Sequence, residues 1–135
     1  MSKTMLIIED DVVSRNLLRL VFEYDGFHCI EAENGAIGLT MLDSQSFDII
    51  ILDNAMPVMT GMAFLDHWQR KPHKPAVPII MITGLLNPEV RENATKLGAY
   101  AIVGKPYDLS ELRGLVSQLS PKNPSLPQEP SLLPK

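Results

Sequence analysis

The sequence predicts an α/β domain in which a five-stranded parallel sheet carries helices on both faces. Two observations support this prediction. Short apolar runs alternate with helical patterns through the first 119 residues of the 135-residue chain, which is typical of repeated βα units. One run, Ile49-Ile50-Ile51-Leu52, is apolar at four successive positions, as in a strand buried on both faces of a parallel sheet.

Five apolar runs and five helical patterns make up this alternation. The expected strands are Met5–Ile8, His28–Ala32, Asp48–Leu52, Ile79–Ile82 and Ala101–Val103. The expected helices are Ser14–Tyr24, Ala36–Leu42, Gly61–Gln69, Glu89–Leu97 and Leu109–Leu119. The boundaries carry the usual signals for helix ends, such as Gly26 and Gly98 after helices and Asn87-Pro88 before one.

The first and last helices each carry an apolar stripe at helical spacing, and we expect both stripes to face the core. In the first helix the stripe is Leu17, Leu20, Val21 and Tyr24, and in the last it is Leu109, Leu112, Val116 and Leu119.

Composition places the chain among ordinary globular proteins, with 45% hydrophobic and 21% charged residues. The net charge of −4 gives no general bias toward nucleic acid. A single cysteine, Cys29, excludes an internal disulfide and suits a reducing compartment. The first apolar run is interrupted by Glu9 and is far too short to span a membrane. We therefore expect a cytoplasmic protein that contacts neither membrane nor nucleic acid through this domain.

Residues 120–135 differ from the rest, because a proline recurs at every third position from Pro121 to Pro130. This period matches the three residues per turn of polyproline II. We expect a folded domain over residues 1–119 and a proline-rich flexible tail or linker over residues 120–135. Two interpretations of the tail stay open: a ligand for a proline-recognising partner or, preferred, a spacer without a fold of its own.

Three acidic residues follow strands that are expected to be neighbours. Glu9 and Asp10 follow the first strand, and Asp53 follows the third. If the strand order is 2-1-3-4-5, these strands meet at the topological switch point, so the three carboxylates converge in one crevice. Carboxylates this close repel one another, and an oxygen-only ligand set favours Mg²⁺ as the shared cation. Asp11 is expected to cap the first helix instead.

Two further side chains are expected at the same edge of the sheet. Thr83 ends the fourth strand, and Lys105 follows the fifth. A metal and an ammonium group neutralise phosphoryl oxygens, and a hydroxyl hydrogen-bonds one of them. Together these residues predict a phosphoryl site in which Asp53 is the nucleophile and carries the phosphoryl group as an acyl phosphate.

These motifs resemble the receiver domains of two-component response regulators, in particular the single-domain chemotaxis type. The resemblance runs from Met5 to Leu119 and is carried by four segments: LIIEDD at 6–11, ILDNAMPVMTG at 51–61, IMITG at 80–84 and VGKP at 103–106. It implies a flavodoxin-like fold with strand order 2-1-3-4-5. It also implies phosphorylation by a sensor histidine kinase or a phosphotransfer domain.

The resemblance assigns roles residue by residue. Asp53 matches the phosphoacceptor, and Glu9 and Asp10 match the paired acids, of which Asp10 would ligate Mg²⁺ directly and Glu9 through water. The backbone carbonyl of Ala55 would complete the metal shell. Thr83 matches the switching hydroxyl, and Lys105 matches the lysine whose bond to the following proline is cis in the family.

The family comparison also implies an output face formed by Glu89–Leu97, Ala101–Val103 and the last helix, with an unidentified partner and a possible homodimer. One departure from the family concerns the switch that links phosphorylation to this face. Receivers commonly carry Tyr or Phe three residues before the lysine, where this chain has Ile102. Such a domain catalyses only its own phosphorylation and dephosphorylation, so we do not expect an enzyme acting on other substrates.

Three alternatives compete with this hypothesis. A phosphorylation-independent pseudo-receiver would keep the fold without accepting phosphate. Against it, all five residues needed for phosphorylation are present: Glu9, Asp10, Asp53, Thr83 and Lys105. A flavodoxin-like cofactor binder would require a phosphate-cradling loop after the first strand, where this chain has Glu9-Asp10-Asp11. A haloacid-dehalogenase-type phosphatase would require a second acid two residues after Asp53, where this chain has Ala55.

Overall fold

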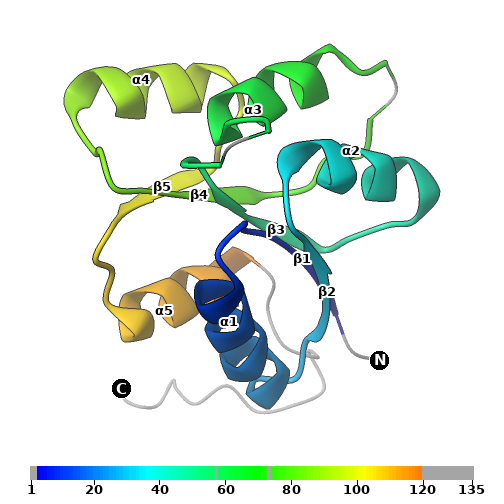
Figure 1. Ribbon diagram of the computed structural model, residues 1–135, viewed down its shortest axis with the longest axis vertical. Helices are drawn as coiled ribbons and strands as arrows, with labels where there is room; N and C mark the ends of the chain where they lie inside the picture. The colour runs from blue at the N-terminus through cyan, green and yellow to red at the C-terminus, as the bar shows by residue number, and fades with distance from the viewer. Residues whose placement is uncertain (1–2, 57, 73, 120–135) are drawn as a thin grey trace.

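A computed structural model describes residues 3–56, 58–72 and 74–119, and it confirms the predicted fold class. Five parallel strands lie in the order β2-β1-β3-β4-β5, and one helix follows each strand (Figure 1). The strands are β1 (Thr4–Ile8), β2 (His28–Ala32), β3 (Ile49–Asp53), β4 (Ile79–Thr83) and β5 (Ala101–Gly104). The helices are α1 (Val12–Tyr24), α2 (Gly35–Ser44), α3 (Gly61–Arg70), α4 (Pro88–Lys96) and α5 (Leu109–Leu119).

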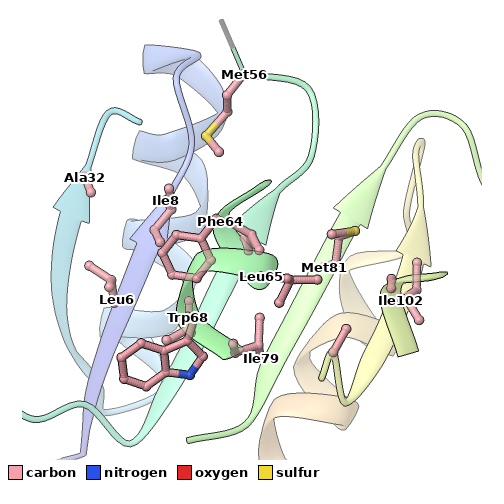
Figure 2. Packing of buried hydrophobic residues seen from close by; sticks show 14 of the residues in the cluster. Leu6, Ile8, Ala32, Met56, Phe64, Leu65, Trp68, Ile79, Met81 and Ile102 are labelled. Atoms are coloured by element: carbon pink, nitrogen blue, oxygen red, sulfur yellow. The ribbon is translucent and has the colours of Figure 1, made fainter. Parts of the chain in front are cut away.

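The sheet is covered on both faces, which explains why each of its three central strands has four successive apolar residues. Helices α2, α3 and α4 cover one face, and α1 and α5 cover the other (Figure 1). Successive side chains of a strand point to opposite faces. Leu6 and Ile8 of β1 therefore pack with Phe64 and Trp68 of α3 (Figure 2), whereas Ile7 packs in the core beneath α1 and α5.

Strand β3 begins one residue later than predicted, at Ile49, and it includes Asp53 as its last residue. Asp48 lies just before the strand, and its carboxylate Oδ2 accepts a hydrogen bond from the backbone N–H of Thr4 at 2.7 Å. Helix α1 begins two residues earlier than predicted, at Val12, because the side chain of Asp11 caps it by accepting the N–H of Ser14 at 2.8 Å.

The predicted core stripe of α1 is wrong for three of its four residues. Leu17, Leu20 and Tyr24 are 48%, 67% and 86% exposed. The helix buries Leu18 and Phe22 instead. Both sets satisfy helical spacing, so periodicity alone cannot choose between them.

The packing of Phe22 shows that the row with Leu18 and Phe22 faces the sheet. Phe22 is fully buried and packs edge-to-face on Phe27, with ring centroids 6.1 Å apart. The stripe of α5 is confirmed for three of its four residues, because Leu112 and Val116 are buried in the same core and the half-buried Leu119 packs against it. Leu109 is half-buried and lies outside that core.

Other boundaries differ from the prediction by up to two residues, as helix and strand ends commonly do. Gly26 and Gly98 have φ values of 100° and 103°, the left-handed conformation expected after a helix. No helix within the described ranges is long and apolar enough to cross a membrane. The proline-rich segment 120–135 lies outside the described residues.

Candidate metal and phosphoryl site

The three predicted acids meet at the carboxyl edge of the sheet. Strands β1 and β3 are neighbours, with Ile8 opposite Leu52, so the residues that follow them emerge side by side. Carboxylate oxygens of Glu9, Asp10 and Asp53 lie within 4.8 Å of one another. Glu9 and Asp53 are buried, with 3% and 2% of their surface exposed, whereas Asp10 is exposed. The arrangement is a carboxylate cluster open to solvent on one side.

Lys105 faces Asp53 across this cluster. Its Nζ lies 2.8 Å from Asp53 Oδ1, but among the residues that the structure describes this oxygen has no partner in hydrogen-bond geometry. A buried carboxylate oxygen without a hydrogen bond is costly unless a cation contacts it. Burial opposes the charge of Lys105, yet Asp53 and Glu9 outweigh it and raise the pKa of its ammonium group.

The environment of Glu9 disfavours its ionised form, mainly through burial. Burial raises the pKa of Glu9 to about 7, the N–H of Asp11 acts against that rise, and the charge of Asp53 adds to it. A carboxylate that resists ionisation beside a second carboxylate is where a divalent cation binds favourably. The all-oxygen ligand set of three converging carboxylates therefore fits Mg²⁺.

Thr83 lies beside Lys105 at the same edge. It is buried as the last residue of β4, opposite Gly104 in the register, and its carbonyl accepts the N–H of Lys105 at 2.7 Å. Its hydroxyl oxygen accepts the N–H of Leu85 at 3.1 Å. The hydroxyl is thus tied to the loop that leads into α4.

The loop after Asp53 is fixed by Asn54, a residue whose role the sequence analysis missed. Its N–H donates to the carbonyl of Ile82 at 2.9 Å, and its side-chain Oδ1 accepts the N–H of Met62 at 3.0 Å. A Cβ on Gly61 would lie 2.8 Å from Asn54 Cα, so only glycine fits there. Ala55 is exposed in this loop, and the ligand role of its carbonyl stays a prediction.

Two details predicted from the family resemblance can be checked. The peptide bond between Lys105 and Pro106 is cis, as expected. Ile102 is buried in the core, whereas Tyr100 precedes β5 and is 65% exposed. Tyr100 therefore does not occupy the place of the usual aromatic residue.

A groove of about 300 Å³ leads from the site toward α1 and is lined by Glu9, Ser14, Leu17, Lys105, Pro106, Tyr107 and Leu109. Tyr107 was not predicted, because a tyrosine after a Lys-Pro pair carries no pattern of its own. Its burial, followed by the charge of Glu9, raises the pKa of its hydroxyl. It is a protonated, half-buried hydrogen-bond donor beside the site.

Comparison with known proteins agrees with this geometry. The family model of the response regulator receiver domain matches residues 5–117. The phosphate regulon transcriptional regulatory protein PhoB of Escherichia coli K12 is 28% identical over 125 residues, which cover 90% of this chain and 55% of that protein. The chain thus spans about half the length of PhoB.

Two further relatives are matched over almost their whole length. Sporulation initiation phosphotransferase F of Bacillus subtilis is 28% identical over 121 residues, which cover 90% of this chain and 96% of that protein. The response regulator TrrA of Thermotoga maritima, solved in complex with Mg²⁺ and BeF, superposes with a TM-score of 0.75 at 28% identity, covering 87% of this chain and 98% of that one.

Proposed function

Since the chain belongs to the response regulator receiver domain family, we propose that Asp53 accepts a phosphoryl group from a histidine kinase or a phosphotransfer domain in a Mg²⁺-dependent reaction. The observation that carries this proposal is the surroundings of Asp53, whose buried carboxylate lies within 4.8 Å of those of Glu9 and Asp10 and 2.8 Å from Lys105 Nζ. A carboxylate oxygen attacks phosphorus, and the bond from phosphorus to the donor histidine nitrogen breaks. The bonding electron pair returns to the imidazole.

The remaining residues act on the phosphoryl oxygens. Mg²⁺ would be held by the carboxylates of Asp10 and Asp53 and by the carbonyl of Ala55, with Glu9 binding through water. When bound, it would neutralise charge on the phosphoryl oxygens. Lys105 supplies a second positive charge on the opposite side of Asp53. Thr83 offers a hydroxyl donor at the end of the adjacent strand. The protein thus catalyses only its own phosphorylation and dephosphorylation, within the cytoplasm.

The same residues link the site to an output face. A phosphoryl group adds nearly two negative charges and three acceptor oxygens. When the hydroxyl of Thr83 turns toward it, the hydrogen bond from Leu85 carries the following loop along. That loop borders a groove of about 530 Å³ between β5 and α5, lined in part by Leu86, Ile102 and Leu115. An output partner, or a second copy of the chain, binds at this α4–β5–α5 face.

The phosphoryl donor approaches along helix α1. Val13, Leu17, Leu20 and Tyr24 form an exposed apolar row, here called the α1 stripe, in which successive residues are three or four positions apart. Leu17 also lines the groove beside Glu9 and Lys105, so the stripe continues into the site. An apolar helix of a kinase or phosphotransfer bundle would cover this stripe while it presents its histidine to Asp53.

Incubation with acetyl phosphate and Mg²⁺, followed by intact mass measurement, tests the proposal. The expected result is one added phosphoryl group in the parent, none without Mg²⁺, and none in Asp53→Asn. Beryllofluoride with amide NMR supplies a second readout, with shifts around Asp53, Thr83 and Lys105. No modification and no shift in the parent would identify the chain as a pseudo-receiver that acts by binding alone.

A further inference from the structure

We propose that Arg15 of α1 is a positioning residue for the metal-binding loop, an inference that rests on the proposed function. Its guanidinium group contacts the loop directly: Nη1 donates to the backbone carbonyl of Glu9 at 2.7 Å. Its Nε donates to Glu31 Oε1 of β2, also at 2.7 Å. Only 14% of the side chain is exposed, so the bridge between helix, loop and strand is largely shielded from water.

This hydrogen bond completes the fixation of Glu9. The N–H of Glu9 donates to the carbonyl of Ala32 at 3.0 Å, and the carboxylate accepts the N–H of Asp11 at 3.1 Å. With Arg15 on the carbonyl, the backbone N–H, backbone C=O and side chain of Glu9 are all held. Asp10 lies between Glu9 and the helix cap Asp11, so its main chain is held from both sides. The loop therefore holds the Glu9 carboxylate and the main chain that carries Asp10 in one arrangement before any cation arrives.

The contact requires arginine rather than lysine. A guanidinium group is a planar fork whose N–H groups reach two acceptors in fixed directions, whereas an ammonium group is a compact point charge on a flexible stem. Arg15 uses the fork on a backbone carbonyl and a carboxylate that belong to different elements.

The charge of Arg15 is compensated, so it does not repel a cation at the neighbouring site. Glu31 lies 2.7 Å from Arg15 and 2.6 Å from Arg19, and although its burial acts in the opposite direction, the two arginines hold the pKa of Glu31 below its usual range. Arg19 also pairs with Glu23. Arg19 thus belongs to the same ion network, but among the described residues its guanidinium group donates to Glu23 and Glu31 and not to the loop. It is therefore a matched control.

The experiment compares Arg15→Gln and Arg19→Gln in the full-length chain, with the Mg²⁺ affinity of each measured by amide NMR titration in the absence of a phosphoryl donor. We expect Arg15→Gln to weaken Mg²⁺ binding by about 10-fold, the scale on which groups that orient metal ligands act. We expect Arg19→Gln to stay within about twofold of the parent, since surface ion pairs contribute little. Arg15→Lys should restore the charge without restoring the affinity.

Thermal unfolding of the same variants separates positioning from stability, because both glutamine variants lose an ion pair with Glu31 and should melt within a few degrees of each other. Equal Mg²⁺ affinities for Arg15→Gln and Arg19→Gln, whether both unchanged or both weakened, would overturn the role of Arg15 and leave the proposed function intact. A parent chain that binds no Mg²⁺ would overturn both.

Discussion

Replacing Glu9 by glutamine should change how the stability of the metal-free protein depends on pH. Folding raises the pKa of Glu9 from 4.5 to about 7, chiefly through burial. Between these values the folded chain holds a proton that the unfolded chain has released. The resulting stabilisation is fully present below pH 4.5 and is lost as the pH rises through about 7. Glutamine cannot titrate, so the free energy of unfolding of Glu9→Gln does not show this loss as the pH rises.

The size of the effect follows from the same two pKa values. Each pKa unit corresponds to about 1.4 kcal/mol, which gives an upper bound of roughly 3–4 kcal/mol for the loss. The protein relaxes around a buried charge, which reduces such energies, so we expect about 1–2 kcal/mol. Measured against the parent, Glu9→Gln should therefore gain that amount of stability between pH 4.5 and pH 7.5 or so.

Urea denaturation in EDTA across this pH range measures the difference, and the parent curve cancels the contribution of all other groups. Adding Mg²⁺ should stabilise the parent more at pH 8 than at pH 5, because the cation replaces the proton of Glu9. Parallel curves for parent and Glu9→Gln in EDTA would refute the reasoning, as would a difference that shrinks as the pH rises.

Three further predictions concern the switch, the loop and the lifetime of the phosphoryl group. Thr83→Ala should still be phosphorylated by acetyl phosphate but lose the amide shifts in α4; parent-like shifts would contradict the coupling. Gly61→Ala should destabilise the fold by about 1–3 kcal/mol in urea, because its Cβ meets backbone at 2.8 Å, whereas Gly114→Ala, which meets nothing within 4 Å, should not. The family resemblance implies that the side chains at Ala55 and Leu85 set the lifetime of the phosphoryl group, and both are apolar here. Neither can orient an attacking water by hydrogen bonding, so the phosphoryl half-life, followed by intact mass, should be minutes or longer rather than seconds.

The site was predictable from sequence because its residues lie at strand ends. Glu9, Asp53, Thr83 and Lys105 each come directly at or after an apolar run. In a parallel sheet all such positions meet at one edge, so a sequence pattern with the right strand order becomes a spatial cluster. The structure brings Glu9, Asp10, Asp53 and Lys105 together, and Thr83 lies beside Lys105, whose backbone N–H its carbonyl accepts.

The contacts that support the site were not predictable in the same way. Arg15 reaches Glu31, sixteen positions away, and Asn54 holds Met62, eight positions away. Such pairs depend on how a helix is rotated against the sheet, and a single sequence does not specify that rotation. The predicted buried face of α1 was wrong for the same reason, because the helix carries two apolar rows of equal periodicity and either could face the core.

The exposed α1 stripe is itself informative about function. A helix that buries Leu18 and Phe22 has a sufficient core face, and stability alone gives no reason to keep Leu20 and Tyr24 apolar at 67% and 86% exposure. Sequence reasoning fails most often where function overrides the local rule. Here the wrong prediction concerns the α1 stripe, which begins at the groove beside the phosphoryl site and runs along the helix that carries Arg15. Under the two proposals above, helix α1 positions the metal-binding loop through Arg15 and offers a docking surface through its exposed row.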